Sequence, residues 1–458
     1  MNMKKKVNIL EDKLDSVIWI IIIPIIATNL IDGIYGIIDS LFVANIGSMA
    51  VASVTFVGPI QDTLSAVGTG LAFAGCGLIA QYIGAGDEKR ARRMIGHVFV
   101  IGTIVGFVVS AFTFFFSEFV LIRAGITDAL IADAKLYLEL TSWSVCFNFI
   151  IIIYLAIERA QGNTKHAMTI NFYSLALKLV FCYLFTILYD GGIAGIGYAT
   201  VLAKGICAVI CIFCMISKKN DRLLKLEEYA ITASHTKILL ITAIPLIMEK
   251  SLVAYGFVIT NKYVLEFGEA VLAAYGVTNK VNSVFFKSVT AFGYGLAVIV
   301  GQNVGAKNID RARAAVRKTM LYSVLVAILA LAFLIPMRPY IASLFIDSSE
   351  ETYQHIINAM GIYTASIIPW GITECVLGIF QGTGYTMYNL TISLVRIYVL
   401  RVPVVIILSQ PFWGLGEFGI WYAMLISNTL CAFFSLSMYF LLRKKVFNHL
   451  FISKVSKE

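Results

Sequence analysis

The feature that most constrains this chain is a series of long apolar segments, which recurs from one end to the other. The first of them contains WIIIIPIIATNL, Trp19 to Leu30, and carries no charged residue. Uncharged runs of about 20 residues are long enough to cross a lipid bilayer as helices. Hydrophobic residues make up 59% of the chain and charged residues 14%, against roughly 45–50% and 25% in soluble domains. We therefore predict an all-α integral membrane protein with many spans.

Twelve spans can be counted, and all should be helical because backbone groups that face lipid must be hydrogen-bonded within their own segment. The predicted spans are 17–44, 51–82, 94–117, 131–158, 166–190, 192–216, 237–265, 270–302, 316–337, 353–380, 388–410 and 418–442. No small-residue cleavage site follows the first apolar run, so we interpret it as an uncleaved span and not as a signal peptide.

The segments between the spans divide into two sets by their content of lysine and arginine. One set is rich in both and includes 89–93, 307–318 and 443–445. The opposite set is nearly bare of both, and its segments NIGSMA, DGGIAG and PFWGLGEFG carry none. Because basic segments stay on the cytoplasmic side, we predict a multi-pass protein of the cytoplasmic membrane with both termini inside the cell. This placement also explains the net charge of +9 without nucleic-acid binding.

An internal repeat divides the chain in two. QYIGAGDEKRAR begins at Gln81 and QNVGAKNIDRAR at Gln302, an offset of 221 residues. Two further matches follow in the same order: RAQGNT (159–164) with IFQGTG (379–384) at offset 220, and GIGYA (195–199) with GIWYA (419–423) at offset 224. A nearly constant offset indicates a duplicated structural unit. The predicted domains are a six-helix lobe over 1–216, a cytoplasmic linker over 217–236, and a six-helix lobe over 237–458 with a short basic tail.

The number of spans in each half sets the relation between the halves. Because six is an even number, the second half begins on the same side of the membrane as the first, and the two repeats are parallel. Transporters built from such repeats hold their substrates near the bilayer midplane, between the halves. The duplication therefore predicts alternating access instead of a fixed pore.

Several motifs resemble those of the multidrug and toxic compound extrusion (MATE) transporters. They are the GAG and GAK loops with their RAR endings, IDSLFVANIG late in the first span, QGNT, QGTG, and RVP in the eleventh span. The resemblance covers essentially the whole chain, and order and spacing carry it more than any single motif. It implies two six-helix lobes around a V-shaped central cleft. It also implies efflux of drugs or metabolites, driven by inward flow of protons or sodium ions.

The resemblance further implies roles for individual residues. Asp39 occupies the position of the first-span acid used for ion coupling, and Pro24 that of a helix-bending proline. Many relatives carry an Asn-x-x-x-Asp pattern in the fifth span, where this chain has Lys178 and Cys182. A two-acid cation site is therefore not expected in this lobe, and Asn171 is the polar residue that would take part beside Asp39.

The first span itself carries two carboxylates inside apolar sequence. Asp32 and Asp39 are seven residues apart, within about 20° of one helix face, and Tyr35 extends the same stripe. An acid at bilayer depth costs roughly 2.5–3.5 kcal/mol, so each should face a cavity and not lipid. Two interpretations remain for Asp39: ion coupling, or pairing with a neighbour such as Lys178. Asp32 either lines the cleft or forms a local hydrogen bond.

Two acids lie in later spans, and each also has two interpretations. Glu249 is adjacent to Lys250, and because neighbouring residues on a helix point about 100° apart, we do not expect these two to pair. Glu249 then faces the substrate cleft or forms a salt bridge elsewhere. Glu374 follows a helix break expected at Pro369–Gly371, where freed backbone groups often line cavities. It contacts substrate or pairs with an arginine of the eleventh span.

Asp62, next to Gln61, lies near the start of the predicted second span. It is either a further cleft residue or a helix cap. Seven basic residues also lie within the spans, namely Lys178, Lys204, Lys250, Lys280, Lys287, Arg396 and Arg401. If most of these pair with the embedded acids, the cleft carries little net charge and the charge of the cargo stays open.

These observations favour a cation-coupled antiporter of small organic, preferentially cationic, compounds. In this hypothesis a proton or Na⁺ engages Asp39 and the first span bends around Pro24, Gly33 and Gly36. The alternative is a flippase of lipid-linked oligosaccharide precursors from the same wider superfamily. The sequence lacks a P-loop, an HExxH motif and a GxGD segment, so we expect no enzyme activity and no cofactor besides the coupling ion. We expect the lipid bilayer and the cargo as partners, no nucleic acid, no bound metal, and a monomer.

Overall fold

The computed structural model describes residues 7–216, 226–347 and 350–448, and this part of the chain is helical without a strand. Its first half contains α1 Leu14–Ala44, α2 Ser48–Gly84, α3 Glu88–Phe115, α4 Ser117–Arg123, α5 Asp128–Ala160, α6 Thr164–Cys182, the π-helix η1 Tyr183–Leu188, α7 Gly192–Ile216 and the short 3₁₀-helix η2 Leu226–Tyr229. Its second half contains α8 Ala233–Leu265, α9 Glu269–Gly305, α10 Ile309–Ser343, α11 Glu351–Tyr363, the 3₁₀-helix η3 Thr364–Ser366, α12 Ile367–Thr383, α13 Met387–Leu394, the π-helix η4 Val395–Arg401, α14 Val402–Leu408, the 3₁₀-helix η5 Pro411–Trp413 and α15 Phe418–Asn448.

These helices supply twelve segments that are long and apolar enough to cross a membrane. Each predicted span overlaps one of them, which confirms the all-α, twelve-span prediction. Many large apolar side chains are exposed on the helices, among them Phe115, Phe213 and Phe433. Such exposure suits a lipid environment, because it would be unfavourable in water over so large an area.

The chain forms two compact units, and α1 and α8 each contribute to both. The N-terminal unit consists of residues 30–250, and the C-terminal unit of residues 1–29 and 251–458. The chain passes between the units after Asn29 and again after Lys250, two positions that are 221 residues apart. This is the offset of the sequence repeat, so the exchange of half-helices follows the duplication. The lobe boundaries predicted from the repeat stay a prediction, and residues 217–225 of the predicted linker lie outside the described residues.

Polar contacts hold the first half of α1 in the C-terminal unit. The Lys318 ammonium of α10 lies 2.7 Å from the Asp15 carboxylate, and the Tyr322 hydroxyl donates to the same group at 2.7 Å. Pro24 and Thr28, both within the last six residues of this half-helix, are buried. At its end, the Asn29 side chain donates to a backbone carbonyl of α9 at 2.8 Å.

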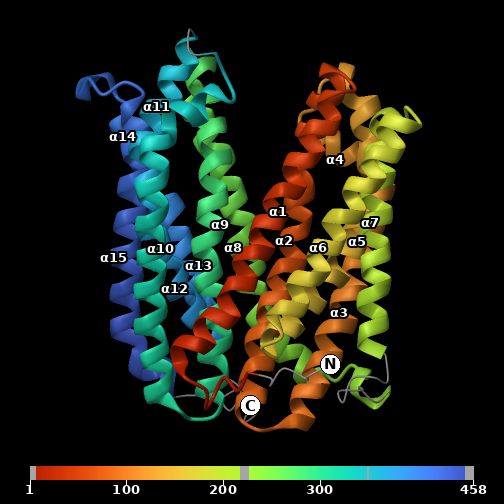
Figure 1. The fold of residues 1–458 in the computed structure, drawn as a ribbon, viewed down its shortest axis with the longest axis vertical. Coiled ribbons are helices and arrows are strands. Elements are labelled where there is room, and N and C mark those ends of the chain that lie inside the picture. The colour runs from red at the N-terminus through yellow and green to blue at the C-terminus, as the bar shows by residue number, and fades with distance from the viewer. Residues whose placement is uncertain (1–6, 217–225, 348–349, 449–458) are drawn as a thin grey trace. The chain divides into compact units, whose positions relative to one another are not determined.

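The N-terminal unit is built around α5, which packs against α2, α3 and α7 (Figure 1). Phe149 on α5 is fully buried and fills the space above Gly68 of α2 and Gly106 of α3, where a Cβ atom would collide with its ring. Small residues of this kind let helices approach closely inside a membrane. The first half of α8 also belongs here, because the Thr232 backbone N–H, at its start, donates to His97 of α3 at 2.8 Å.

The C-terminal unit is centred on the contact between α9 and α12 (Figure 1). Gly378 and Gly382 form a small-x-x-x-small pair on α12, and they face Gly293 and Ala297 on α9. A Cβ atom at Gly378 would collide with the carbonyl of Gly293, and one at Gly382 with the carbonyl of Ala297. The backbones of the two helices are therefore in direct contact, as in other membrane helix pairs with this motif.

The duplication is visible in the backbone as well as in the sequence. Gly47 and Gly268 precede α2 and α9 with φ values of 144° and 105°. Gly86 and Lys307 occupy the middle of the GAG and GAK loops, and both are left-handed, with φ values of 70° and 59°. The fifth and eleventh spans each contain a π-helix, η1 and η4. A π-helical turn is uncommon and is often found at functional sites.

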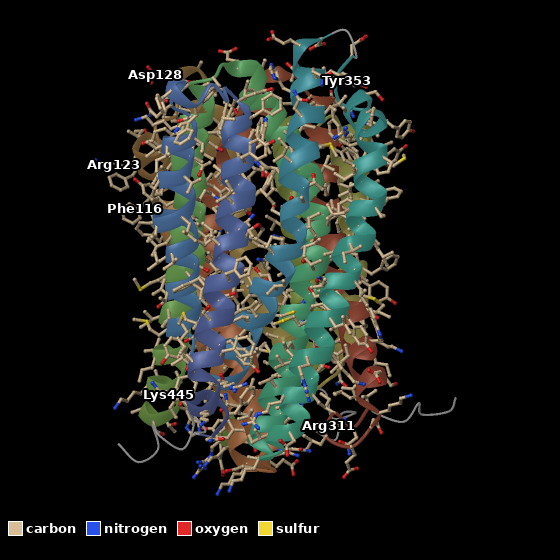
Figure 2. All side chains as sticks on the ribbon, turned by 90° about the vertical axis from the view of Figure 1, so that its left-hand side faces the viewer. Phe116, Arg123, Asp128, Arg311, Tyr353 and Lys445 are labelled. Atoms are coloured by element: carbon tan, nitrogen blue, oxygen red, sulfur yellow. The ribbon has the colours of Figure 1, made fainter. Side chains whose placement is uncertain are left out.

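The ends of the C-terminal unit differ in charge. Arg311 and Lys445 lie at one end of this unit and Tyr353 at the other (Figure 2). The basic end also holds Arg313 and Arg317 at the start of α10. This distribution agrees with the predicted cytoplasmic placement of the basic segments, and the location of the termini stays a prediction.

Candidate functional site

Helix α1 carries the acidic stripe of the first span without interruption from Leu14 to Ala44. Pro24 lies inside the helix, one turn and a half before the chain enters the N-terminal unit. A proline inside a helix removes one backbone hydrogen bond and crowds the preceding turn, so it weakens the helix at this point. Gly33 and Gly36 follow in the second half, and an added Cβ atom at either one would meet no atom within 4 Å. Close packing therefore does not require these two glycines, which leaves backbone flexibility as their effect.

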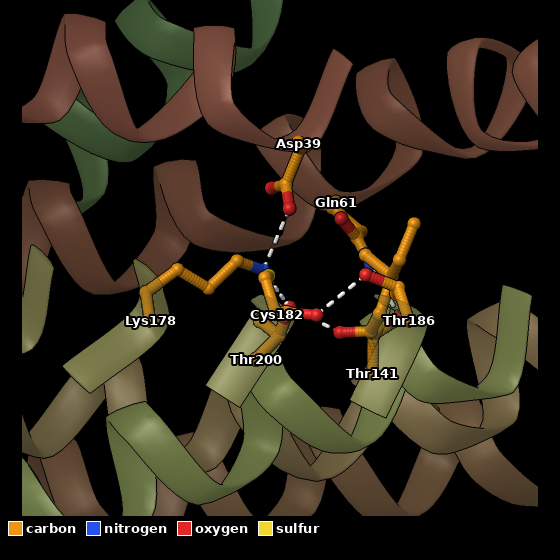
Figure 3. Close-up of polar contacts among 8 residues, drawn as sticks. Asp39, Gln61, Thr141, Lys178, Cys182, Thr186 and Thr200 are labelled. Atoms are coloured by element: carbon orange, nitrogen blue, oxygen red, sulfur yellow. Dashed lines mark hydrogen bonds and ion pairs between the residues drawn. The ribbon is translucent and has the colours of Figure 1, made fainter. Parts of the chain in front are cut away.

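Asp39, near the end of α1, forms an ion pair with Lys178 of α6. The Lys178 Nζ atom lies 2.6 Å from the Asp39 Oδ1 atom, and the two side chains point toward each other (Figure 3). The Lys178 side chain is 0% exposed, whereas that of Asp39 is 21% exposed. Of the two interpretations of Asp39 from the sequence, pairing with Lys178 is present in the structure, and ion coupling stays a prediction.

The Lys178 ammonium has two further partners in the N-terminal unit. It donates to the Thr200 hydroxyl of α7, and this hydroxyl in turn donates to the carbonyl of Ile196 at 2.9 Å. It also lies 5.1 Å from the centre of the Tyr35 ring, within cation–π range. The sequence analysis identified Lys178 as a possible partner of Asp39, but nothing in the sequence pointed to Thr200.

The second acid of the stripe, Asp32, lies against Asn171. The Asn171 side chain of α6 donates to the Asp32 Oδ1 atom at 3.3 Å. The structure therefore places Asn171 beside Asp32, two helical turns from Asp39, whereas the sequence analysis placed it beside Asp39. Asp32 itself is exposed, and its local hydrogen bond was one of its two expected interpretations. Lys204 of α7 completes this region, with its ammonium 5.7 Å from the Tyr35 ring centre.

Helix α2 adds a polar pair on another side of the site. The Gln61 side chain donates to the Thr141 hydroxyl of α5, which donates to the carbonyl of Tyr137 at 2.6 Å (Figure 3). Asp62, the next residue, is exposed and lies in the middle of α2, which begins at Ser48. The expectation of a helix cap at Asp62 is therefore wrong, because the helix begins at Ser48, more than three turns before Asp62.

Glu249 and Lys250 of α8 form an ion pair, contrary to expectation. The Lys250 Nζ atom lies 3.1 Å from the Glu249 Oε1 atom, and Glu249 is 3% exposed. The expectation rested on the 100° between neighbouring helix positions, and it neglected the reach of a lysine side chain, whose four methylenes can turn the ammonium back. Lys250 also lies 5.8 Å from the ring centre of Phe73.

In the C-terminal unit, Glu374 of α12 is buried, and the two arginines of η4 are buried as well. The Arg396 guanidinium lies over the Trp370 ring at 4.4 Å, and Arg401 donates to the Asn428 Oδ1 atom of α15 at 2.9 Å. The helix break predicted at Pro369–Gly371 lies slightly earlier, at the 3₁₀-helix η3, because a proline is tolerated in the first turn of the new helix α12. A role of Glu374 toward substrate stays a prediction.

Comparison with known proteins places this arrangement in a family. The MatE family model matches residues 24–184 and 245–407, one match in each half of the duplication. The chain is 22% identical over 418 residues to the "Probable multidrug resistance protein YoeA" of Bacillus subtilis, covering 87% of this chain and 88% of that protein. It is 21% identical over 428 residues to the "Multidrug export protein MepA" of Staphylococcus saprophyticus, covering 93% of each.

Solved structures share the fold. A MATE structure in complex with MaL6 superimposes with a TM-score of 0.91 at 18% identity and covers all of both chains. An outward-facing multidrug resistance MATE family transporter of the MOP superfamily gives a TM-score of 0.91 at 18% identity, covering 97% of this chain and 99% of that one. Since the family model covers well over half of the sequence, the chain belongs to the MatE family, whose members are membrane transporters and not enzymes.

Proposed function

We propose that this protein is an ion-coupled antiporter that exports small organic compounds across the cytoplasmic membrane by alternating access, with Asp39 as the coupling carboxylate. The observation that carries the proposal is the Asp39–Lys178 pair inside the membrane-spanning part of the N-terminal unit. Ionisable groups within spans are costly and are therefore a sign of ion or substrate pathways. The multidrug names of the relatives support the export of organic compounds.

The cargo we propose first is cationic. Asp32 and Asp62 are exposed acids on α1 and α2, and the Tyr35 ring on the same stripe of α1 offers a face to a cation. Transport requires that ion and cargo occupy the site in turn. Each can shift the protein between its two conformations only if it binds one conformation more tightly than the other. Loss of the negative charge at Asp39 removes that difference in affinity for the ion.

The test is efflux of a fluorescent cationic dye from vesicles that contain the purified protein, with proton and sodium gradients imposed separately. Wild type should export the dye under at least one gradient, and Asp39→Asn should not. A loss in Asp39→Asn alone is ambiguous, because this change leaves the Lys178 ammonium buried without its carboxylate. The matched control is Asp39→Asn/Lys178→Met, which removes both charges and should fold but fail to couple.

Two results contradict the proposal. Gradient-driven efflux at the wild-type rate in the double variant would exclude Asp39 as the coupling group. No dye movement under either gradient, together with movement of a fluorescent lipid-linked oligosaccharide between leaflets, would favour the flippase alternative. The basic residues Lys178 and Lys204 in the N-terminal unit are the observation that keeps this second function under test.

A further inference from the structure

We propose that the Lys178 ammonium is a tethered cation that occupies the cation position at Asp39, so that the ion exchanged at this carboxylate is a proton and not a sodium ion. This inference rests on the proposed function, because it names the ion that the proposed transport uses. Its physical basis is the local geometry of Lys178, in which each N–H donor of the ammonium has a partner. It concerns only the N-terminal unit, in which all of the residues below lie.

The contacts of Lys178 suit an ammonium. A protonated lysine has three N–H donors and no acceptor. One donor points to the Asp39 Oδ1 atom at 2.6 Å, and a second points to the Thr200 hydroxyl. That hydroxyl has committed its own proton to the Ile196 carbonyl, so toward Lys178 it can only accept. The third donor has the Tyr35 ring face, whose centre lies 5.1 Å away.

The same geometry places the Lys178 ammonium where another cation would have to bind the Asp39 Oδ1 atom. A sodium ion needs several oxygen ligands around it, as other hard cations do. Among the described residues, no group of three or more His, Cys, Asp or Glu side chains is placed to hold a metal ion. The other acid of the stripe, Asp32, lies two turns away and accepts from Asn171. Sodium bound at the Asp39 Oδ1 atom would have to displace an ammonium whose side chain is 0% exposed.

A proton needs neither a ligand shell nor the displacement of Lys178, although it removes the negative charge that compensates the buried ammonium. When Asp39 binds a proton, its carboxylate becomes a carboxylic acid, and the carbonyl oxygen of that acid still accepts a hydrogen bond from the ammonium. The fifth of the Asp39 side chain that stays exposed gives the proton a path to solvent.

The surroundings of Asp39 contain further groups that take part in this equilibrium. The titratable side chains close enough to interact electrostatically with Asp39 or with its neighbours Tyr35 and Lys204 are Asp32 and Tyr35 on α1, Asp62 on α2, Tyr137 on α5, Lys178 and Cys182 on α6, and Lys204 and Cys207 on α7. Lys204 is the informative one. It lies on the same Tyr35 ring as Lys178 but makes no ion pair with Asp39. Removing it therefore changes the charge of the region by the same amount without freeing Asp39.

The experiment measures sodium binding without transport, by thermal unfolding of the full-length protein in detergent. Sodium chloride is replaced stepwise by choline chloride at constant ionic strength. A cation that binds only the folded state raises the melting temperature with the logarithm of its concentration. Wild type should show no sodium-specific rise. Lys178→Met should show one, because Asp39 is then a carboxylate without a partner.

Four comparison variants make the outcome decisive. Lys178→Arg, Lys204→Met and Asp39→Asn/Lys178→Met should all show no sodium-specific rise, since each either keeps a cation at Asp39 or removes the carboxylate. Lys178→Gln serves as the second variant if Lys178→Met does not fold, because its amide can still bond to Thr200. A sodium-specific rise in wild type that disappears in the double variant overturns the proposal. So does the absence of any rise in folded Lys178→Met or Lys178→Gln.

The vesicle assay separates this inference from the proposed function. If dye moves under a proton gradient but not under a sodium gradient, both stand. If dye moves under the sodium gradient in wild type, the function stands and the inference is wrong. If no dye moves under either gradient, the proposed function fails, and the unfolding assay still decides whether Lys178 excludes sodium from Asp39.

Discussion

The buried pair between Asp39 and Lys178 predicts a specific pattern of stability in a double-mutant cycle. At the observed 2.6 Å, an effective dielectric constant of 20 gives an attraction of about 6 kcal/mol, which desolvation of the two charges largely offsets. Removing one partner of a buried pair costs about 3–5 kcal/mol, because the remaining charge is left without compensation. We expect the lower end of this range, near 3 kcal/mol, because 21% of the Asp39 side chain is exposed.

The cycle compares Asp39→Asn, Lys178→Met and the double variant by thermal unfolding in detergent at one pH. Asp39→Asn should be the less stable single variant, because the ammonium that it leaves is 0% exposed. Lys178→Met should cost less, because the remaining acid reaches solvent and can take up a proton. The double variant should lie within about 1 kcal/mol of wild type, since a buried pair can often be replaced by neutral groups with little loss. Losses in the double variant that equal the sum of the two single losses would refute the reasoning, because additivity means that the two side chains do not interact.

Further predictions concern the backbone and the partners of Lys178. Gly378→Ala should lower the melting temperature strongly, because the added Cβ atom collides with the Gly293 carbonyl. Gly33→Ala should raise the melting temperature slightly, because its Cβ atom meets no atom within 4 Å. Equal effects of the two substitutions would contradict the packing of α9 on α12. Lys307→Gly should stabilise the protein by about 1 kcal/mol, because Lys307 is left-handed, and a loss of stability on this change would disprove strain at that position. Thr200→Val should cost about 1 kcal/mol by removing an acceptor of the ammonium, and an unchanged melting temperature would show that this hydrogen bond does not contribute.

The sequence predicted the spans well because the signal for a membrane helix is local. An apolar run of sufficient length is recognised without knowledge of its neighbours, and all twelve predicted spans overlap helices of the structure. The predicted second span, 51–82, lies within three residues of helix α2 at both ends. The interpretation of Asp62 as a helix cap was wrong because Asp62 lies well inside that predicted span and fourteen residues after Ser48.

The candidate site was predicted only in part, because its contacts join residues that are distant in the sequence. The resemblance identified Asp39, and the departure from the family pattern identified Lys178. Thr200 lies on a third helix, and no local pattern marks a threonine as the acceptor of a buried ammonium. For the adjacent residues Glu249 and Lys250, the sequence argument excluded a contact that is present. It considered only the angle between neighbouring helix positions and treated long side chains as if they were rigid.

The duplicated halves differ at the position of the acid, and this difference bears on where exchange takes place. With the repeat offset of 221, the counterpart of Asp39 is Thr260, which is buried and donates to a backbone carbonyl of its own helix at 2.9 Å. The offset lies between 220 and 224 around the fifth and eleventh spans, so the counterpart of Lys178 falls within 398–402, where Arg401 is the basic residue.

Both halves therefore keep a buried cation at this place, and within the described residues only the N-terminal unit pairs it with a carboxylate. Arg401 is held by Ser427 and Asn428, which cannot titrate. A guanidinium with neutral partners stays charged throughout the physiological range, because arginine is not deprotonated in proteins. The Asp39–Lys178 pair contains a carboxylate, so in the mechanism that we propose the exchangeable proton belongs to the N-terminal unit and the C-terminal unit carries a fixed charge.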